Sequence, residues 1–118
     1  MIKVVSKQIL TLAGAATAAL FLSAPALAAD VDAAAAKKLA RADHCLRCHA
    51  VEKKKEGPSY HAVAYKYKGQ ADAMDKLVAH ITSGEKVKLS DGHEENHKVT
   101  KAKDEAQVRN LIAWILAQ

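Results

Sequence analysis

Residues 45–49 read Cys45-Leu46-Arg47-Cys48-His49, and this stretch decides how the rest of the chain is interpreted. Two cysteines separated by two residues and followed directly by a histidine form the attachment motif of a c-type haem. Each thiol would form a thioether with one vinyl group of the porphyrin, and the adjacent imidazole would be the proximal ligand of the iron. The sequence holds no other cysteine, so no disulfide competes for these thiols. A thioredoxin-like redox pair would leave His49 unexplained, and a zinc site would need a second pair of ligands. The motif therefore predicts one covalently bound haem c.

The N-terminal region has the pattern of a secretory signal peptide. Two lysines precede an almost wholly apolar run from Ile9 to Leu22, and Ala26-Leu27-Ala28 supplies an A-x-A cleavage site. The run of about 14 residues is shorter than the roughly 20 that a transmembrane helix needs, and an uncleaved membrane anchor is the alternative interpretation. Attachment of c-type haem takes place outside the bacterial cytoplasm, which agrees with export. We therefore predict that residues 1–28 are a cleaved signal peptide, that residues 29–118 form one domain, and that this domain is periplasmic.

The predicted mature domain is small and only weakly charged. Domains of this size often need a cofactor or cross-link besides their core, and the haem would supply it. Removing residues 1–28 removes two lysines and leaves 16 basic against 13 acidic groups, a net charge of +3 that two haem propionates would largely cancel. We therefore expect no nucleic-acid partner. The run Lys53-Lys54-Lys55 predicts a solvated loop, with weak steering of an anionic partner as the alternative.

The remaining sequence predicts an all-α fold. Helical spacing of apolar residues, cap signals and a closing glycine indicate four helices, over residues 32–42, 59–67, 72–83 and 104–117. Asp91-Gly92 marks a turn in the mixed segment between the last two helices. No alternating strand pattern of any length occurs.

Three stretches carry a resemblance to a known family. Residues 45–60, with Gly-Pro at the expected distance after the haem motif, residues 63–69 (VAYKYKG) and the closing segment 104–118 resemble the short bacterial class I cytochromes c, which bind a single haem. The resemblance covers essentially the whole predicted mature domain. It implies three to five helices wrapped round one covalently bound haem. It also implies that the carbonyl oxygen of Pro58 accepts a hydrogen bond from His49, which would fix the ring and make it a more basic ligand.

The distal side departs from this resemblance. Members of the family usually present a methionine there, in a Pro-Met-Pro-like loop before the last helix. This chain has only Met1 and Met74, and the corresponding loop, residues 90–100, contains two histidines instead. Counted back from the last helix, the family's methionine falls nearest His97. We therefore expect His97 to be the distal ligand of the iron, with His93 as the alternative.

The function that these residues predict is electron transfer by a protein that is not an enzyme. A methionine ligand raises the haem potential, so a second imidazole is expected to lower it. The expected partners are redox proteins that donate and accept the electron, without stable membrane insertion after signal cleavage. His80 and Lys98 are weaker candidates for the distal ligand. The alternative function is a haem protein that binds or senses CO, NO or O₂ through a displaceable distal ligand.

Overall fold

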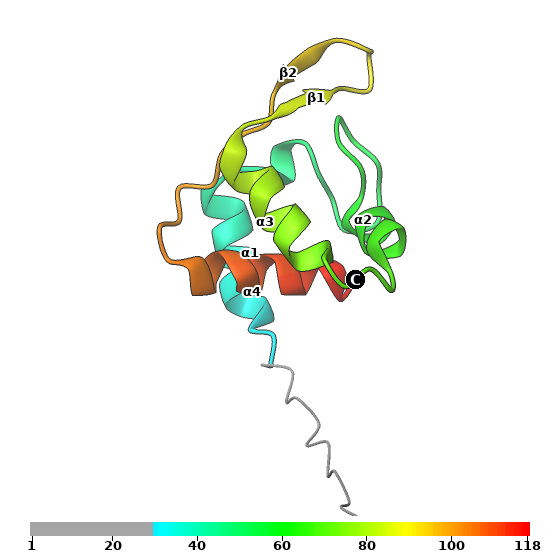
Figure 1. Ribbon diagram of the computed structural model, residues 1–118. Helices are drawn as coiled ribbons and strands as arrows, with labels where there is room; N and C mark the ends of the chain where they lie inside the picture. Colours follow the sequence, from blue (N-terminus) through cyan, green and yellow to red (C-terminus); the bar gives the residue numbers. More distant parts are fainter. Residues whose placement is uncertain (1–29) are drawn as a thin grey trace, which may run out of the picture.

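The computed structural model describes residues 30–118, so the predicted signal peptide lies outside the described residues. The elements in chain order are α1 (Ala33–Ala42), the 3₁₀ turn η1 (Cys45–Arg47), α2 (Tyr60–Tyr67), α3 (Ala73–Ser83), β1 (Lys86–Lys88), β2 (Glu94–Asn96) and α4 (Glu105–Leu116). The all-α prediction is confirmed, and each expected helix agrees within one residue at either end (Figure 1). None of the helices in this range is long and apolar enough to cross a membrane.

Polar caps determine where three of these helices begin. The side chains of Asp32, Ser59 and Asp104 each accept a hydrogen bond from a backbone N–H in the first turn of α1, α2 and α4, respectively. Such a bond satisfies one of the N–H groups that a helix N-terminus leaves unpaired. At the other end of α3, Gly84 adopts a left-handed conformation with φ of 68°, which glycine accepts without a Cβ penalty. Local sequence thus sets the helix boundaries.

Helix α4 is the centre of the core, because α1, α2 and α3 all pack against it (Figure 1). Its buried side chains follow helical spacing along one side: Val108, Leu111, Ile112, Trp114 and Ile115. Ala36 and Ala40 of α1 are almost completely buried, and these small side chains allow the two helices to approach closely. A pair of hydrogen bonds joins the start of α1 to α4. Asp32 N–H donates to Asn110 Oδ1 and Asn110 Nδ2 donates to the Asp32 carbonyl oxygen, both at 2.9 Å.

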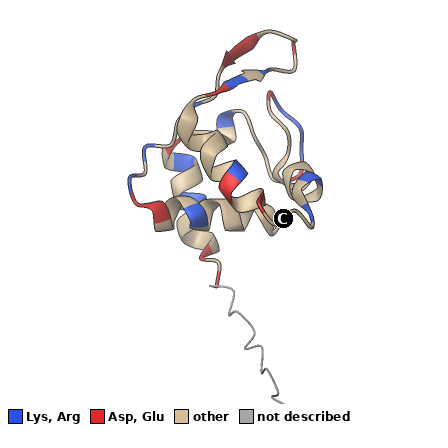
Figure 2. Ribbon diagram, in the orientation of Figure 1, with Lys and Arg blue, Asp and Glu red and all other residues tan. Residues whose placement is uncertain are grey.

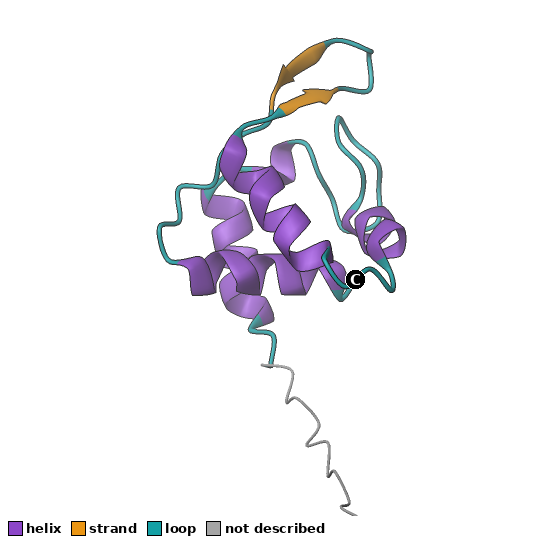
Figure 3. Cartoon of the chain, in the orientation of Figure 1, coloured by secondary structure: helices purple, strands orange, loops and turns teal. Residues whose placement is uncertain are grey.

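A β-hairpin between α3 and α4 is the feature that the sequence did not predict. Strands β1 and β2 are antiparallel, with Lys88 opposite Glu94 and Lys86 opposite Asn96. Each strand has only three residues, which is too short to display an alternating pattern. The hairpin projects beyond the helices (Figure 3), and lysines of one strand lie near acidic residues of the other (Figure 2). Near its tip, Ser90 Oγ donates to Glu56 Oε2 at 2.6 Å, which ties the hairpin to the loop that follows η1.

Candidate functional site

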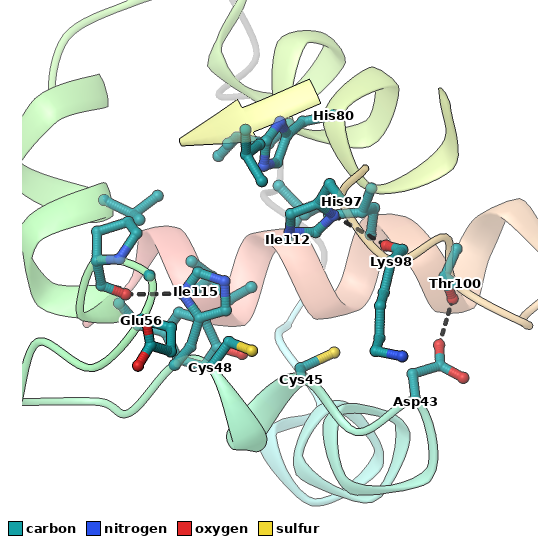
Figure 4. A pocket seen from close by; sticks show the side chains of 18 of the residues that line it. Asp43, Cys45, Cys48, Glu56, His80, His97, Lys98, Thr100, Ile112 and Ile115 are labelled. Atoms are coloured by element: carbon teal, nitrogen blue, oxygen red, sulfur yellow. Dashed lines mark hydrogen bonds between the residues drawn. The ribbon is translucent and has the colours of Figure 1, made fainter. Parts of the chain in front are cut away.

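A cavity of about 610 Å³ lies between the helices and the base of the hairpin. This volume falls within the range of about 300–1,000 Å³ that is usual for cofactor pockets. Its apolar wall includes Leu77, Ile81, Leu111, Ile112 and Ile115. The structure brings to this one cavity all four residues predicted to hold the haem directly: Cys45, Cys48, His49 and His97. Figure 4 shows the two cysteines on one side of the space and His97 with its neighbour His80 on another.

The two cysteines are presented by a single tight turn. The N–H groups of Cys48 and His49 both donate to the carbonyl oxygen of Cys45, at 3.2 and 3.0 Å. Both thiols are free and half-buried. Burial raises the pKa of the Cys45 thiol, and the nearby carboxylate of Asp43 raises it further. Two thiols one turn apart at a cavity wall suit thioether formation with a bound porphyrin.

His49 is held with one ring nitrogen free. Its Nδ1 lies 2.7 Å from the carbonyl oxygen of Pro58, so the hydrogen bond implied by the family resemblance is present. Because a carbonyl only accepts, Nδ1 carries the proton and Nε2 keeps the lone pair that a metal requires. Tyr60 stacks on the ring, with centroids 5.5 Å apart and an angle of 17° between the planes. Burial lowers the pKa of His49, outweighing the opposite effect of the Pro58 hydrogen bond, so the ring is neutral at pH 7.

Gly57 leaves room for this imidazole. The sequence did not reveal this role, because the Gly-Pro pair at this position was noted only as part of the family resemblance. A Cβ at position 57 would lie 2.5 Å from His49 Cε1 and 2.9 Å from Nδ1. Real Cβ atoms essentially never make contacts this short, and the ring is flanked by Tyr60 on another side. Glycine is therefore required at position 57 by packing against the ring.

Gly57→Ala is accordingly expected to displace His49. The variant should incorporate less haem or give an altered haem spectrum, and should lose about 1–3 kcal/mol of stability, as is usual for overpacking. The control is Gly69→Ala, where φ of 76° imposes backbone strain but no atom lies within 4 Å of the added carbon. That control should lose stability and keep the wild-type spectrum. A Gly57→Ala protein with a wild-type absorption spectrum would contradict this role.

His97 faces His49 across the cavity. Their ring centroids are 6.2 Å apart, with an angle of 49° between the planes. An imidazole nitrogen lies about 2 Å from a transition metal, so two imidazoles on opposite sides of one ion have ring centres roughly 6 Å apart. The His97 Nδ1 donates to the Lys98 carbonyl oxygen at 2.9 Å, which again leaves Nε2 with its lone pair. Burial is the main cause that lowers the pKa of His97. The residues present therefore fit a haem whose iron would be held by the imidazoles of His49 and His97.

The other distal candidates are placed less favourably. His93 is exposed on the hairpin, where its Nδ1 lies 2.5 Å from Asp91 Oδ1, and it is not among the residues that line the cavity. His80 lines the cavity, but its Nδ1 is hydrogen-bonded to the Glu85 carboxylate and its ring lies beside that of His97, with centroids 4.3 Å apart. Lys98 lines the cavity but is exposed, whereas His97 is half-buried, and Met74 packs against the core without lining the cavity. The geometry favours His97 over all four.

The lysine run after the motif has a mixed role. Lys55 Nζ donates to the carbonyl oxygen of Leu46 at 2.6 Å and so closes its loop onto the cysteine-bearing turn. Lys53 and Lys54 are exposed, as expected for a solvated loop. Two of the three charges therefore remain available to face a partner.

The family model, the related sequences and the similar solved structure are all cytochromes c. The cytochrome c family model matches residues 33–118, a range that includes every residue lining the cavity. Cytochrome c-552 of Hydrogenobacter thermophilus is 35% identical over 81 residues, which cover 69% of this chain and 79% of that protein. Cytochrome c2 of Rhodocyclus tenuis is 54% identical over 46 residues, which span 39% of this chain and only half of that relative. The crystal structure of the class 1 cytochrome MtoD from Sideroxydans lithotrophicus ES-1 is similar with a TM-score of 0.72 and 56% identity, covering 75% of this chain and 97% of that one.

Proposed function

The chain belongs to the cytochrome c family, whose members carry covalently bound haem c, and from this premise we propose that it is a periplasmic carrier of single electrons whose haem iron is ligated by His49 and His97. Haem c supplies a reversible one-electron change at its iron. The observation that carries the proposal is a pair of imidazoles in one cavity, with ring centroids 6.2 Å apart. In each ring the Nδ1–H group donates a hydrogen bond to a backbone carbonyl oxygen, and Nε2 keeps its lone pair.

The chain's own residues have distinct tasks in this proposal. Cys45 and Cys48 hold the porphyrin edge through thioethers, which keeps the cofactor attached through repeated oxidation and reduction. Pro58 orients His49 and increases its basicity through the Nδ1 hydrogen bond, and the Lys98 carbonyl does the same for His97. We propose that electrons enter and leave on the side of the haem that Cys45 and Cys48 would hold, where both cysteines are half-buried, with redox proteins as donor and acceptor.

The proposed reduction potential of the haem is low because, among the described residues, no methionine lines the distal side of the cavity. Thioether ligation favours ferrous iron and raises the potential, whereas an imidazole donates more strongly to ferric iron. The only methionine within residues 30–118 is Met74, which lies in α3 and does not line the cavity. We therefore propose a potential below that of cytochromes c with a histidine–methionine pair.

Periplasmic location is supported by residues 1–28, whose pattern is that of an exported protein, and by the extracytoplasmic chemistry of haem attachment.

Binding of CO, NO or O₂ as the main function would require His97 to leave the iron readily. The backbone around His97 argues against this, because its N–H donates to the Glu85 carbonyl oxygen at 2.8 Å and closes the base of the hairpin.

The proposal is tested by a potentiometric titration of the haem-loaded protein. We expect a single wave with the slope of a one-electron couple. His97→Met should raise the midpoint by more than about 59 mV, a tenfold change in a one-electron equilibrium. A multi-electron wave, or an equal or lower midpoint in a low-spin His97→Met protein, would contradict the assignment of His97.

A further inference from the structure

The chain just beyond His97 is fastened to two helices. Thr100 N–H donates to the carbonyl oxygen of Ile81 near the end of α3, at 2.9 Å. The Thr100 hydroxyl donates to the Asp43 carboxylate, a contact drawn as a dashed line in Figure 4. The N–H of Lys101 reaches the same carboxylate oxygen at 3.3 Å. Both side chains are buried, with 9% of Asp43 and 8% of Thr100 exposed, so water does not replace these bonds easily.

Asp43 lies between helix α1 and the turn that bears the haem cysteines. It is the C-cap residue of α1, where its N–H donates to the Leu39 carbonyl oxygen at 2.9 Å, and it precedes Cys45 by two residues. Its side chain therefore connects the segment that bears the haem cysteines to the segment that bears His97, through a bond between residues 57 positions apart. A hydrogen bond with a charged acceptor is stronger than one between neutral groups, and leaving a buried carboxylate without its partner is unfavourable.

The segment from His97 to Thr100 is thus fixed at both ends. The His97 N–H bond to Glu85 holds its start, and the bonds of Thr100 to Ile81 and Asp43 hold its end. Only two residues separate the anchors, so the position of the His97 ring depends on both. The hairpin before His97 is largely exposed and offers little packing of its own.

We propose that Asp43 and Thr100 form a clamp that positions His97 and keeps it at the iron when small ligands compete for the distal side. The proposal rests on the proposed role of His97 as distal ligand. In it, Asp43 and Thr100 are positioning residues, because they act through His97. Neither residue was identified from the sequence, since an Asp–Thr pair 57 positions apart carries no local pattern.

The test is the rate of CO binding to the ferrous, haem-loaded protein. Thr100→Val removes the hydroxyl at nearly unchanged volume. We expect a low-spin spectrum before CO is added and CO binding accelerated at least about tenfold, the lower limit of the effect of losing one hydrogen bond to a charged group. Thr100→Ser, which keeps the hydroxyl, should bind CO close to the wild-type rate. If Thr100→Val does not incorporate haem, Asp43→Asn provides the same test, with a smaller acceleration expected because the acceptor loses its charge.

Two controls separate positioning from general loss of stability. Thr82→Val makes the same substitution on α3, where Thr82 Oγ1 donates to the Val78 carbonyl oxygen at 2.7 Å, and should leave the rate unchanged. Asn110→Ala removes the hydrogen bonds between α1 and α4 and should lower the thermal stability without accelerating CO binding. The clamp is overturned if Thr100→Val binds CO as slowly as the wild type, or if Asn110→Ala accelerates binding equally. Rapid CO binding by the unmodified protein would instead overturn ligation by His97, and the clamp with it.

Discussion

Replacing His97 with alanine is expected to convert a six-coordinate, low-spin haem into a five-coordinate, high-spin one. In the structure His97 is the imidazole whose ring lies opposite that of His49, at a centroid distance of 6.2 Å. Alanine removes the Nε2 donor and leaves the distal side of the cavity open. The ferrous variant should bind CO at once, whereas the wild type should resist it. The absorption spectrum of both oxidation states, before and after addition of CO, measures this directly.

His93→Ala is the matched control for this experiment. His93 belongs to the same loop, but it is exposed and paired with Asp91 outside the cavity. Its removal should leave spectrum, spin state and CO resistance unchanged. If His93→Ala loses the low-spin spectrum and His97→Ala keeps it, the assignment of the distal ligand is reversed. If His97→Ala stays low-spin through His80, the adjacent ring has replaced the ligand, which the double variant with His80→Ala would show by becoming high-spin.

The second large effect is expected from removing the haem attachment. The double variant Cys45→Ala and Cys48→Ala should not retain the cofactor and should lose cooperative folding. Without the haem, the apolar side chains that line the cavity lose the group against which they pack, and their contact with water destabilises the fold. Domains of this size often depend on such a cofactor for their stability.

Far-UV circular dichroism and thermal unfolding test this prediction. We expect reduced helix content and no sharp transition for the haem-free protein, because α2, α3 and α4 all contribute side chains to the cavity wall. Each single cysteine variant, with one thioether remaining, should fall between the double variant and the wild type. A haem-free double variant that unfolds cooperatively near the wild-type temperature would show that the core stands without its cofactor.

The sequence predicted most of the elements because their signals are local. Helix α4 displays its apolar face at helical spacing, and Asp104 caps its start, so its position is encoded in consecutive residues. The turn that holds Cys45, Cys48 and His49 is likewise a motif of adjacent residues. His97 was reached differently, by comparing the loop with the methionine position of similar proteins. Ligation by His97 is a proposal, which the 6.2 Å between the ring centroids of His49 and His97 supports.

The features that escaped prediction depend on contacts between distant segments. The steric role of Gly57 exists only because the His49 ring lies over it, and the bond from Thr100 to Asp43 joins residues 57 positions apart. The hairpin has strands of three residues, in which an alternating pattern cannot be recognised. The proximity of His80 to His97 depends on how α3 packs beside the loop, which helical periodicity does not determine.

The most direct test of the account is the absorption spectrum of the unmodified ferrous protein before and after saturation with CO. Axial ligation by both His49 and His97 predicts a low-spin spectrum that CO leaves essentially unchanged, as an electron carrier with a firmly held distal ligand requires. A high-spin spectrum, or rapid and complete conversion to the CO form, would contradict this ligation and would identify a site built to bind a small gaseous ligand.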